Sequence, residues 1–175
     1  GMANTFLAAQ GCAMGKSLVE EDKIELAKEL LAKADQNKVN LLLPTDLVMA
    51  EAFAPDAKHV NEDVHHLNQE YMGLDIGTET AKAYAEALAD AKMIVWNGPM
   101  GVFEMDAFCK GTEAVAKAVA RSRAISMVVT LLLLLKNWAW QNEFLTFLPV
   151  VALPWNTWKA RFCQVLLHWT TCVVK

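Results

Sequence analysis

A short segment in the middle of the chain combines residue types that suit nucleotide binding. It runs from Asn97 to Glu104, directly after the apolar residues 93–96, and it contains Gly98 and Gly101. Glycine permits positive φ angles and close approach of a ligand to the backbone, and a carboxylate after such a turn can accept hydrogen bonds from ribose hydroxyls. The same spacing also fits a tight turn between a strand and a helix, so spacing alone leaves both interpretations open.

Two other groups of residues resemble sites only in composition. Gly11–Ser17 has glycines and a lysine in the order of a P-loop, but three residues separate the glycines where four are required. His59, His65 and His66 lie near two carboxylates in a polar stretch, which we interpret as a solvated loop rather than a metal site. We therefore predict no metal ligand and no catalytic residue in this chain.

The elements that would position these residues alternate between helices and strands. Apolar residues recur at helical spacing in some segments, whereas other segments are short apolar runs typical of strands covered on both faces. The pattern predicts helices at about 5–10, 18–35, 78–91 and 112–120, and strands at 39–43, 47–50 and 93–96. This alternation indicates an α/β fold with a three-layer, Rossmann-like parallel sheet. Ligands bind such sheets beyond the carboxyl ends of the strands, which places the site after Leu43 and Trp96.

Three residues are predicted to set helix boundaries. Ser17 precedes Glu20 by three positions, the spacing of a capping box, and Thr78 can cap the helix that follows it. Gly11 is placed to end the first short helix.

Composition excludes several classes of protein. The 175 residues are 54% hydrophobic and 21% charged, with a formal net charge of −4, which fits neither a disordered chain nor a basic nucleic-acid binder. The four cysteines form no CxxC pair and no zinc-ligand spacing, so a reducing cytoplasm is the expected location. The apolar segment at 127–135 is too short for a spanning helix, so no membrane partner is predicted.

The chain changes character near residue 125. Residues 1–125 hold 19 of the 20 acidic residues and 12 of the 16 basic ones, so their formal charge is −7 and that of the remainder is +3. All eight glycines lie at or before Gly111, whereas five of the six tryptophans follow residue 137. We therefore treat 1–125 and 126–175 as separate parts, the second an atypical apolar tail.

Residues 1 to about 125 closely resemble the carboxyl-terminal, nucleotide-binding domain of phosphoglycerate kinase. The segments that carry the resemblance, in order and spacing, are Gly1–Phe6, Gly15–Leu18, Leu43–Asp46, Gly73–Gly77 and Val95–Glu104. The Trp-Asn-Gly-Pro stretch followed by Gly-Val-Phe-Glu is among the clearest signatures of that family. The chain departs from the family at Asn68–Tyr71, where an Asp-Gly-Trp type of turn is usual, and at Thr78, which replaces a proline.

The resemblance implies transfer of a phosphoryl group between 1,3-bisphosphoglycerate and Mg-ADP in glycolysis, by an enzyme that is usually monomeric. It implies that Gly73 and Leu74 flank the adenine, with Gly1 beside the base. Asn97 would lie near the nucleotide phosphates, and Glu104 would bind the ribose. The implied cofactors are ATP or ADP and Mg²⁺.

The resemblance also predicts what the sequence does not contain. The amino-terminal domain that binds 3-phosphoglycerate and the nucleotide-binding lysine before the glycine-rich turn are both missing. Beyond Ser126 the family has a Gly-Gly-Gly-Asp loop for phosphate and metal, and this sequence has an apolar run instead. We expect the chain to be a fragment that is inactive alone. The alternative is a non-catalytic adenine-nucleotide module whose tail docks a partner or a membrane, or associates with itself.

The tail is interpreted as the family's own carboxyl terminus read in the wrong frame. With plausible codons, a common displacement converts Met127–Leu134 into Gly-Gly-Asp-Ser-Ala-Ala-Ala. The same displacement converts Pro149–Asn156 into Thr-Gly-Gly-Gly-Ala-Ser-Leu-Glu. Both products are glycine-rich motifs that the family carries in this order.

Overall fold

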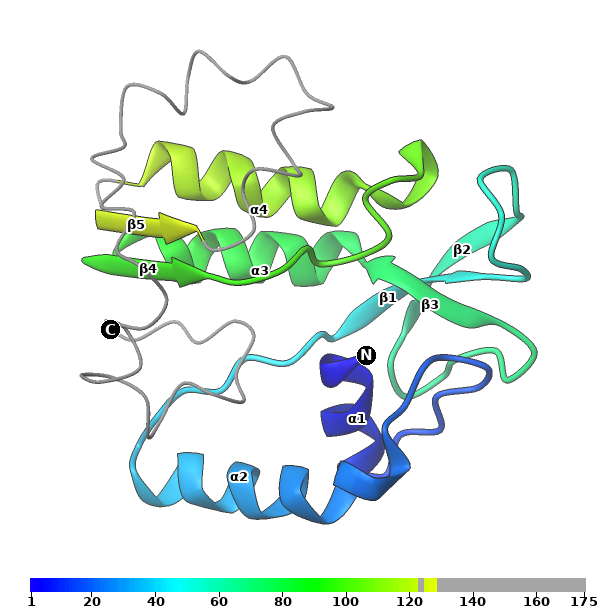
Figure 1. Cartoon of the computed structure of the whole chain (residues 1–175), viewed down its shortest axis with the longest axis horizontal. Helices are drawn as coiled ribbons and strands as arrows, with labels where there is room; N and C mark the ends of the chain where they lie inside the picture. The colour runs from blue at the N-terminus through cyan, green and yellow to red at the C-terminus, as the bar shows by residue number, and fades with distance from the viewer. Residues whose placement is uncertain (123–124, 129–175) are drawn as a thin grey trace, which may run out of the picture.

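A computed structural model describes residues 1–122 and 125–128 (Figure 1). Its elements are, in order, α1 (Met2–Ala9), the 3₁₀ helix η1 (Glu21–Lys23), α2 (Ile24–Gln36), β1 (Asp46–Ala50), β2 (His59–Asp63), β3 (Met72–Ile76), α3 (Thr78–Ala89), β4 (Met93–Trp96), the 3₁₀ helix η2 (Asp106–Phe108), α4 (Lys110–Arg121) and β5 (Ile125–Val128). Strand β5 spans the predicted boundary at residue 125, and the predictions for residues 129–175 lie outside the described residues. Of the described helices, none has the length and apolar character to cross a bilayer.

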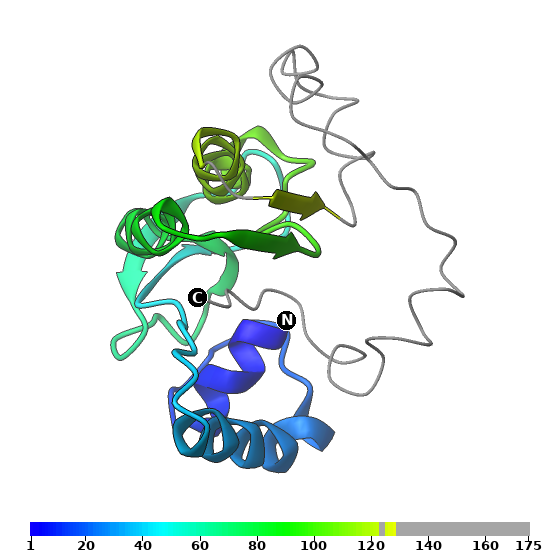
Figure 2. The same cartoon turned by 90° about the vertical axis from the view of Figure 1, so that its left-hand side faces the viewer.

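Strands β4 and β5 form a parallel pair, with Met93 opposite Ile125 and Trp96 opposite Val128. Helices α3 and α4 pack against each other along this pair (Figures 1 and 2). Buried apolar side chains fill the space between the two helices and β4: Ile76, Leu88, Ala91, Ile94, Trp96, Val115, Ala116 and Val119. The predicted α/β class, the strand at 93–96 and the helices that flank it are confirmed.

The second sheet is antiparallel and was not predicted. Its order is β2-β1-β3, and β1 pairs antiparallel with both neighbours. Strand β1 confirms the prediction at 47–50, but the histidine-rich stretch interpreted as a loop contains β2, which begins at His59. Most of β2 is exposed, because it is an edge strand with one ladder partner. The prediction of a wholly parallel sheet is therefore wrong for this part of the chain.

The predicted strand at 39–43 is also wrong. Residues 39–43 pair with no strand among the described residues, and they form an irregular connection between α2 and β1. Its apolar side chains remain partly accessible, with Val39 43% and Leu42 37% exposed. A run of apolar residues becomes a strand only where another strand satisfies its backbone groups.

Two predicted helix caps differ from the structure. The helix expected from residue 18 begins later, as η1 followed by α2, because the hydroxyl of Ser17 is used elsewhere: it accepts the N–H of Gly73 at 2.9 Å. Helix α3 does begin at Thr78, but Gly77 is its N-cap residue and Thr78 does not cap it. The prediction for Gly11 fits the structure, since this residue follows α1 with φ of 91°.

Candidate functional site

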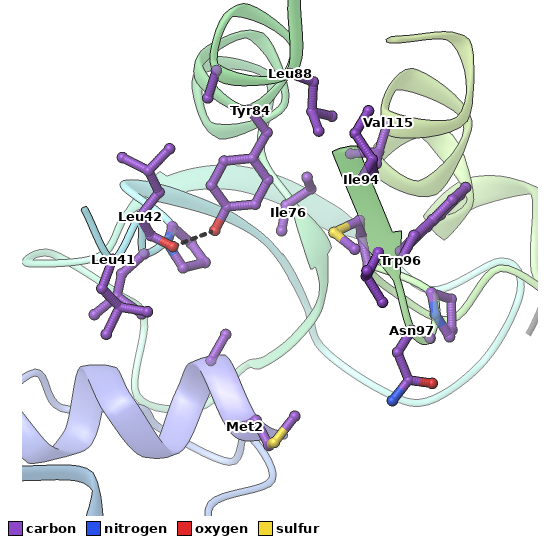
Figure 3. Close-up of a pocket in the computed structure, with 18 of the residues that line it drawn as sticks. Met2, Leu41, Leu42, Ile76, Tyr84, Leu88, Ile94, Trp96, Asn97 and Val115 are labelled. Atoms are coloured by element: carbon purple, nitrogen blue, oxygen red, sulfur yellow. Dashed lines mark hydrogen bonds between the residues drawn. The ribbon is translucent and has the colours of Figure 1, made fainter. Parts of the chain in front are cut away.

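A cavity of about 360 Å³ opens between α1, the irregular segment before β1 and the carboxyl end of β4. Gly1 and Ala3 line it from α1 and its start, and Leu41 lines it from the connecting segment. Trp96 and Asn97 line it from the end of β4. Figure 3 shows Met2 and Asn97 at its lower edge and Tyr84 and Leu88 at its upper edge. The cavity therefore lies at the carboxyl end of β4, where the sequence predicts the site.

A few polar groups interrupt its apolar wall. The hydroxyl of Tyr84 donates to the carbonyl oxygen of Leu42 at 3.3 Å (Figure 3), and burial raises the pKa of Tyr84 to about 12. The indole N–H of Trp96 is buried without a hydrogen-bond partner among the described residues. An apolar cavity with a few polar groups is the usual form of a small-molecule site.

The structure divides the predicted site residues among three places. Gly1 and Asn97 are far apart in sequence, yet both line the cavity. Gly73 and Leu74 lie in β3, and neither lines the cavity. Glu104 is exposed in the turn between β4 and η2.

Two neighbouring elements hold the 97–104 segment. The N–H of Val102 donates to the carbonyl oxygen of Leu74 at 2.9 Å, which ties the segment to β3. The N–H of Met100 donates to the hydroxyl of Thr112 in α4 at 3.0 Å, and Thr112 is fully buried. The predicted nucleotide segment is thus fixed to both β3 and α4, although only Asn97 of the predicted residues within it lines the cavity.

Asp75 is a functional candidate that sequence reasoning did not single out. It lies in β3, is 3% exposed, and its carboxylate accepts the N–H of Gly111 at 2.7 Å and that of Ile76 at 2.9 Å. Burial raises the pKa of Asp75 to about 6, although both hydrogen bonds act to lower it. A charged residue among apolar ones within the predicted Gly73–Gly77 motif was the available signal.

Comparison with known proteins decides the family. The model of the phosphoglycerate kinase family matches residues 1–131, which is most of the chain. The chain belongs to the phosphoglycerate kinase family. The resemblance seen in the motifs of the sequence is therefore confirmed, and the match continues six residues beyond the predicted boundary.

Two similar proteins are phosphoglycerate kinases from named organisms. The chain is 59% identical over 128 residues to the enzyme of Moorella thermoacetica, covering 73% of this chain and 33% of that protein. It is 54% identical over 129 residues to that of Trichodesmium erythraeum, covering 73% of this chain and 32% of that protein. The chain thus spans about a third of the length of these phosphoglycerate kinases.

Solved structures agree with this assignment. The structure of phosphoglycerate kinase from Coxiella burnetii matches with a TM-score of 0.78 at 40% identity, over 82% of this chain and 37% of that one. The phosphoglycerate kinase of Pyrococcus horikoshii matches with a TM-score of 0.62 at 34% identity, over 72% of this chain and 32% of that one.

Proposed function

We propose that this chain carries the adenine-nucleotide-binding part of a phosphoglycerate kinase, which transfers a phosphoryl group between 1,3-bisphosphoglycerate and ADP in cytoplasmic glycolysis. The observation that supports it most is that Gly1 and Asn97, both assigned to the nucleotide by the family resemblance, line one cavity at the carboxyl end of β4. Such strand ends are where α/β folds bind nucleotides. The non-catalytic alternative is not favoured, since the matched relatives are phosphoglycerate kinases.

The remaining site residues lie outside the cavity, and we assign their roles from the family resemblance. We assign Gly73 to the adenine on the family resemblance, although the side chains of Leu47, Met49 and Ser17 lie 3.4–3.5 Å from the position of a Cβ atom at this glycine. The exposed carboxylate of Glu104 makes no ion pair with any other described residue, which leaves it available to ribose hydroxyls. We assign Leu74 to the apolar side of the adenine and Asn97 to the phosphates.

Magnesium would act in the family reaction by neutralising phosphate charge. Among residues 1–122 and 125–128, however, no three side chains of the His, Cys, Asp and Glu types form a group that could hold a metal ion. The family resemblance places the loop for phosphate and metal beyond Ser126, where this sequence has an apolar run instead, so we assign Mg²⁺ no ligand among the described residues. We expect the affinity for ADP to change little when Mg²⁺ is added.

Replacement of the ribose-binding carboxylate tests the proposed site. In a calorimetric titration of the full chain with ADP, Glu104→Ala should weaken binding by about tenfold, the effect of losing a charge-assisted hydrogen bond. Glu86→Ala is the matched control, because Glu86 is also an exposed carboxylate and lies on α3. Equal affinities for the two variants and the unmodified chain would remove Glu104 from the site.

We also propose that the chain divides into a partial kinase domain at 1–125 and a frame-displaced tail at 126–175. The family match supports this by ending at residue 131, shortly after glycines disappear from the sequence. The coding nucleotides decide it. The displaced frame should spell the glycine-rich family motifs without stop codons, and a frame interrupted by stops would contradict the proposal.

A further inference from the structure

Asp75 connects three parts of the molecule through backbone groups. Its Oδ2 atom accepts the N–H of Gly111 in the first turn of α4, and its Oδ1 atom accepts the N–H of Ile76 in β3. Gly101 of the 97–104 segment packs on the same residue, because a Cβ atom at Gly101 would lie only 2.7 Å from the Asp75 Cα. Gly111 is equally confined, with a Cβ position 2.9 Å from the Asp75 Cγ.

The segment that follows β4 passes this junction on its way to α4. Figure 1 shows it passing the end of β3 before it rises to α4. The hydrogen bonds from Val102 to Leu74 and from Met100 to Thr112 tie it to β3 on one side and to α4 on the other. A change in how Asp75 joins β3 to α4 therefore moves both attachment points of the segment relative to each other.

We infer that Asp75 is a positioning residue for nucleoside binding. Its charged carboxylate joins α4 to β3, a link that we call the clamp, and the clamp holds the 97–104 segment in its binding position. Protonation of the carboxylate at acidic pH weakens the clamp and therefore weakens nucleoside binding. The inference rests on the proposed function, because it assigns Asn97 and Glu104 to the nucleotide. Asp75 itself is not proposed to touch the ligand.

The chemistry of the junction sets the pH range. Burial raises the pKa of Asp75 to about 6, so the clamp loses charge between roughly pH 7 and 5. Protonation turns one of the two carboxylate oxygens into an uncharged hydroxyl, which is a weaker acceptor for its N–H group. The β1 residue opposite Asp75 is Val48, which does not titrate. Around α4, burial raises the pKa of the Cys109 thiol, and Glu113, Asp106 and Asp75 add to that shift, so Cys109 stays neutral in this range.

Stability and binding should respond to acid in opposite directions. The pKa of Asp75 is raised above its ordinary value of 3.8, so between the two values the folded chain binds more protons than the unfolded chain. This group therefore increases the free energy of unfolding as the pH falls towards 4. A loss of nucleoside affinity between pH 7 and 5 without a loss of stability separates positioning from a structural role.

Adenosine is the probe, because it has no phosphate and stays uncharged between pH 5 and 7.5. For the unmodified full chain, calorimetry should show affinity falling about tenfold from pH 7.5 to 5.0 with a midpoint near 6, the scale of one lost charge-assisted hydrogen bond. Asp75→Asn should bind about tenfold more weakly at pH 7.5 and show no pH dependence. Thermal unfolding at each pH is measured in parallel.

The outcomes separate this inference from the proposed function. A flat profile for the unmodified chain, or the same slope in Asp75→Asn, overturns the role of Asp75. Failure of adenosine to bind at any pH counts against the proposed function instead. NMR of the unmodified chain then tests the positioning role, and this test does not depend on whether Asp75→Asn folds. The amide signals of Gly111 and Val102 should titrate together near pH 6, and a Val102 signal that ignores the titration of Asp75 overturns the clamp.

Discussion

The 175-residue chain, assayed alone with 1,3-bisphosphoglycerate and ADP, should show no turnover above background. Phosphoryl transfer depends on holding two substrates in line, and in such enzymes closure around both of them completes the site. These residues cover 33% of the length of the Moorella thermoacetica enzyme. The family resemblance places the phosphoglycerate-binding basic cluster in the amino-terminal domain. The expected result is a loss of essentially the whole rate enhancement.

A coupled spectrophotometric assay measures this, with the Moorella thermoacetica enzyme as the active reference. Glu104→Ala is assayed beside the unmodified chain, because a contaminating host kinase would be unaffected by that substitution. Turnover that disappears in Glu104→Ala would contradict the prediction and would show that the chain itself performs the reaction.

Two apolar runs of similar appearance had different outcomes. Residues 93–96 were predicted as a strand and form β4, which pairs with β5 over four residues. Residues 39–43 were predicted in the same way and form no strand with the described residues. The local sequence indicates that a segment is apolar and suited to an extended conformation. Whether the segment forms a strand depends on whether another strand lies beside it in the folded chain.

Strands β2 and β3 were missed for a related reason. Strand β3 contains Gly73 and Asp75, two residue types that are poor in strands, and β2 is largely polar. Asp75 is tolerated because Gly111, far along the chain, supplies a backbone N–H to its carboxylate. Sequence reasoning located the 97–104 segment from its own residues, but the partner that fixes it in place became visible only in the folded chain.

Helix starts show the same limit of local signals. Ser17 and Thr78 both satisfied short-range capping patterns, yet neither caps the helix that was predicted for it. The side chain that satisfies the first turn of α3 is Asp46, which lies in β1. Its Oδ1 atom accepts the N–H of Thr80 at 2.8 Å, and its Oδ2 atom accepts the N–H of Glu79 at 3.1 Å. A cap supplied from another element leaves no signature next to the helix.

Replacement of this remote cap should destabilise the fold strongly. Asp46 is 7% exposed, and besides the two amides it accepts the Thr80 hydroxyl at 2.5 Å and the Asn61 side-chain amide at 2.7 Å. Asp46→Ala leaves the buried N–H of Thr80 without its acceptor and removes the hydrogen bonds from Glu79 and Asn61, which should lower the free energy of unfolding by about 3 kcal/mol. The expected fall in Tm is roughly 10 °C for a chain of this size. Asp56→Ala, at an exposed turn, is the matched control.

The pH dependence of the stability loss in Asp46→Ala shows whether the charged carboxylate of Asp46 is its cause. Burial acts to raise the pKa of Asp46, but the hydrogen bonds from Thr80, Asn61 and the backbone of α3 outweigh it and hold the pKa below its ordinary value of 3.8. Since the folded pKa is depressed, the stabilisation is fully present above the unfolded value and is lost as the pH falls through the folded value. Urea unfolding should therefore show a constant difference between the unmodified chain and Asp46→Ala from pH 5 to 7, which shrinks below about pH 4. A difference that persists unchanged at pH 3 would assign the loss to packing rather than to the charged cap.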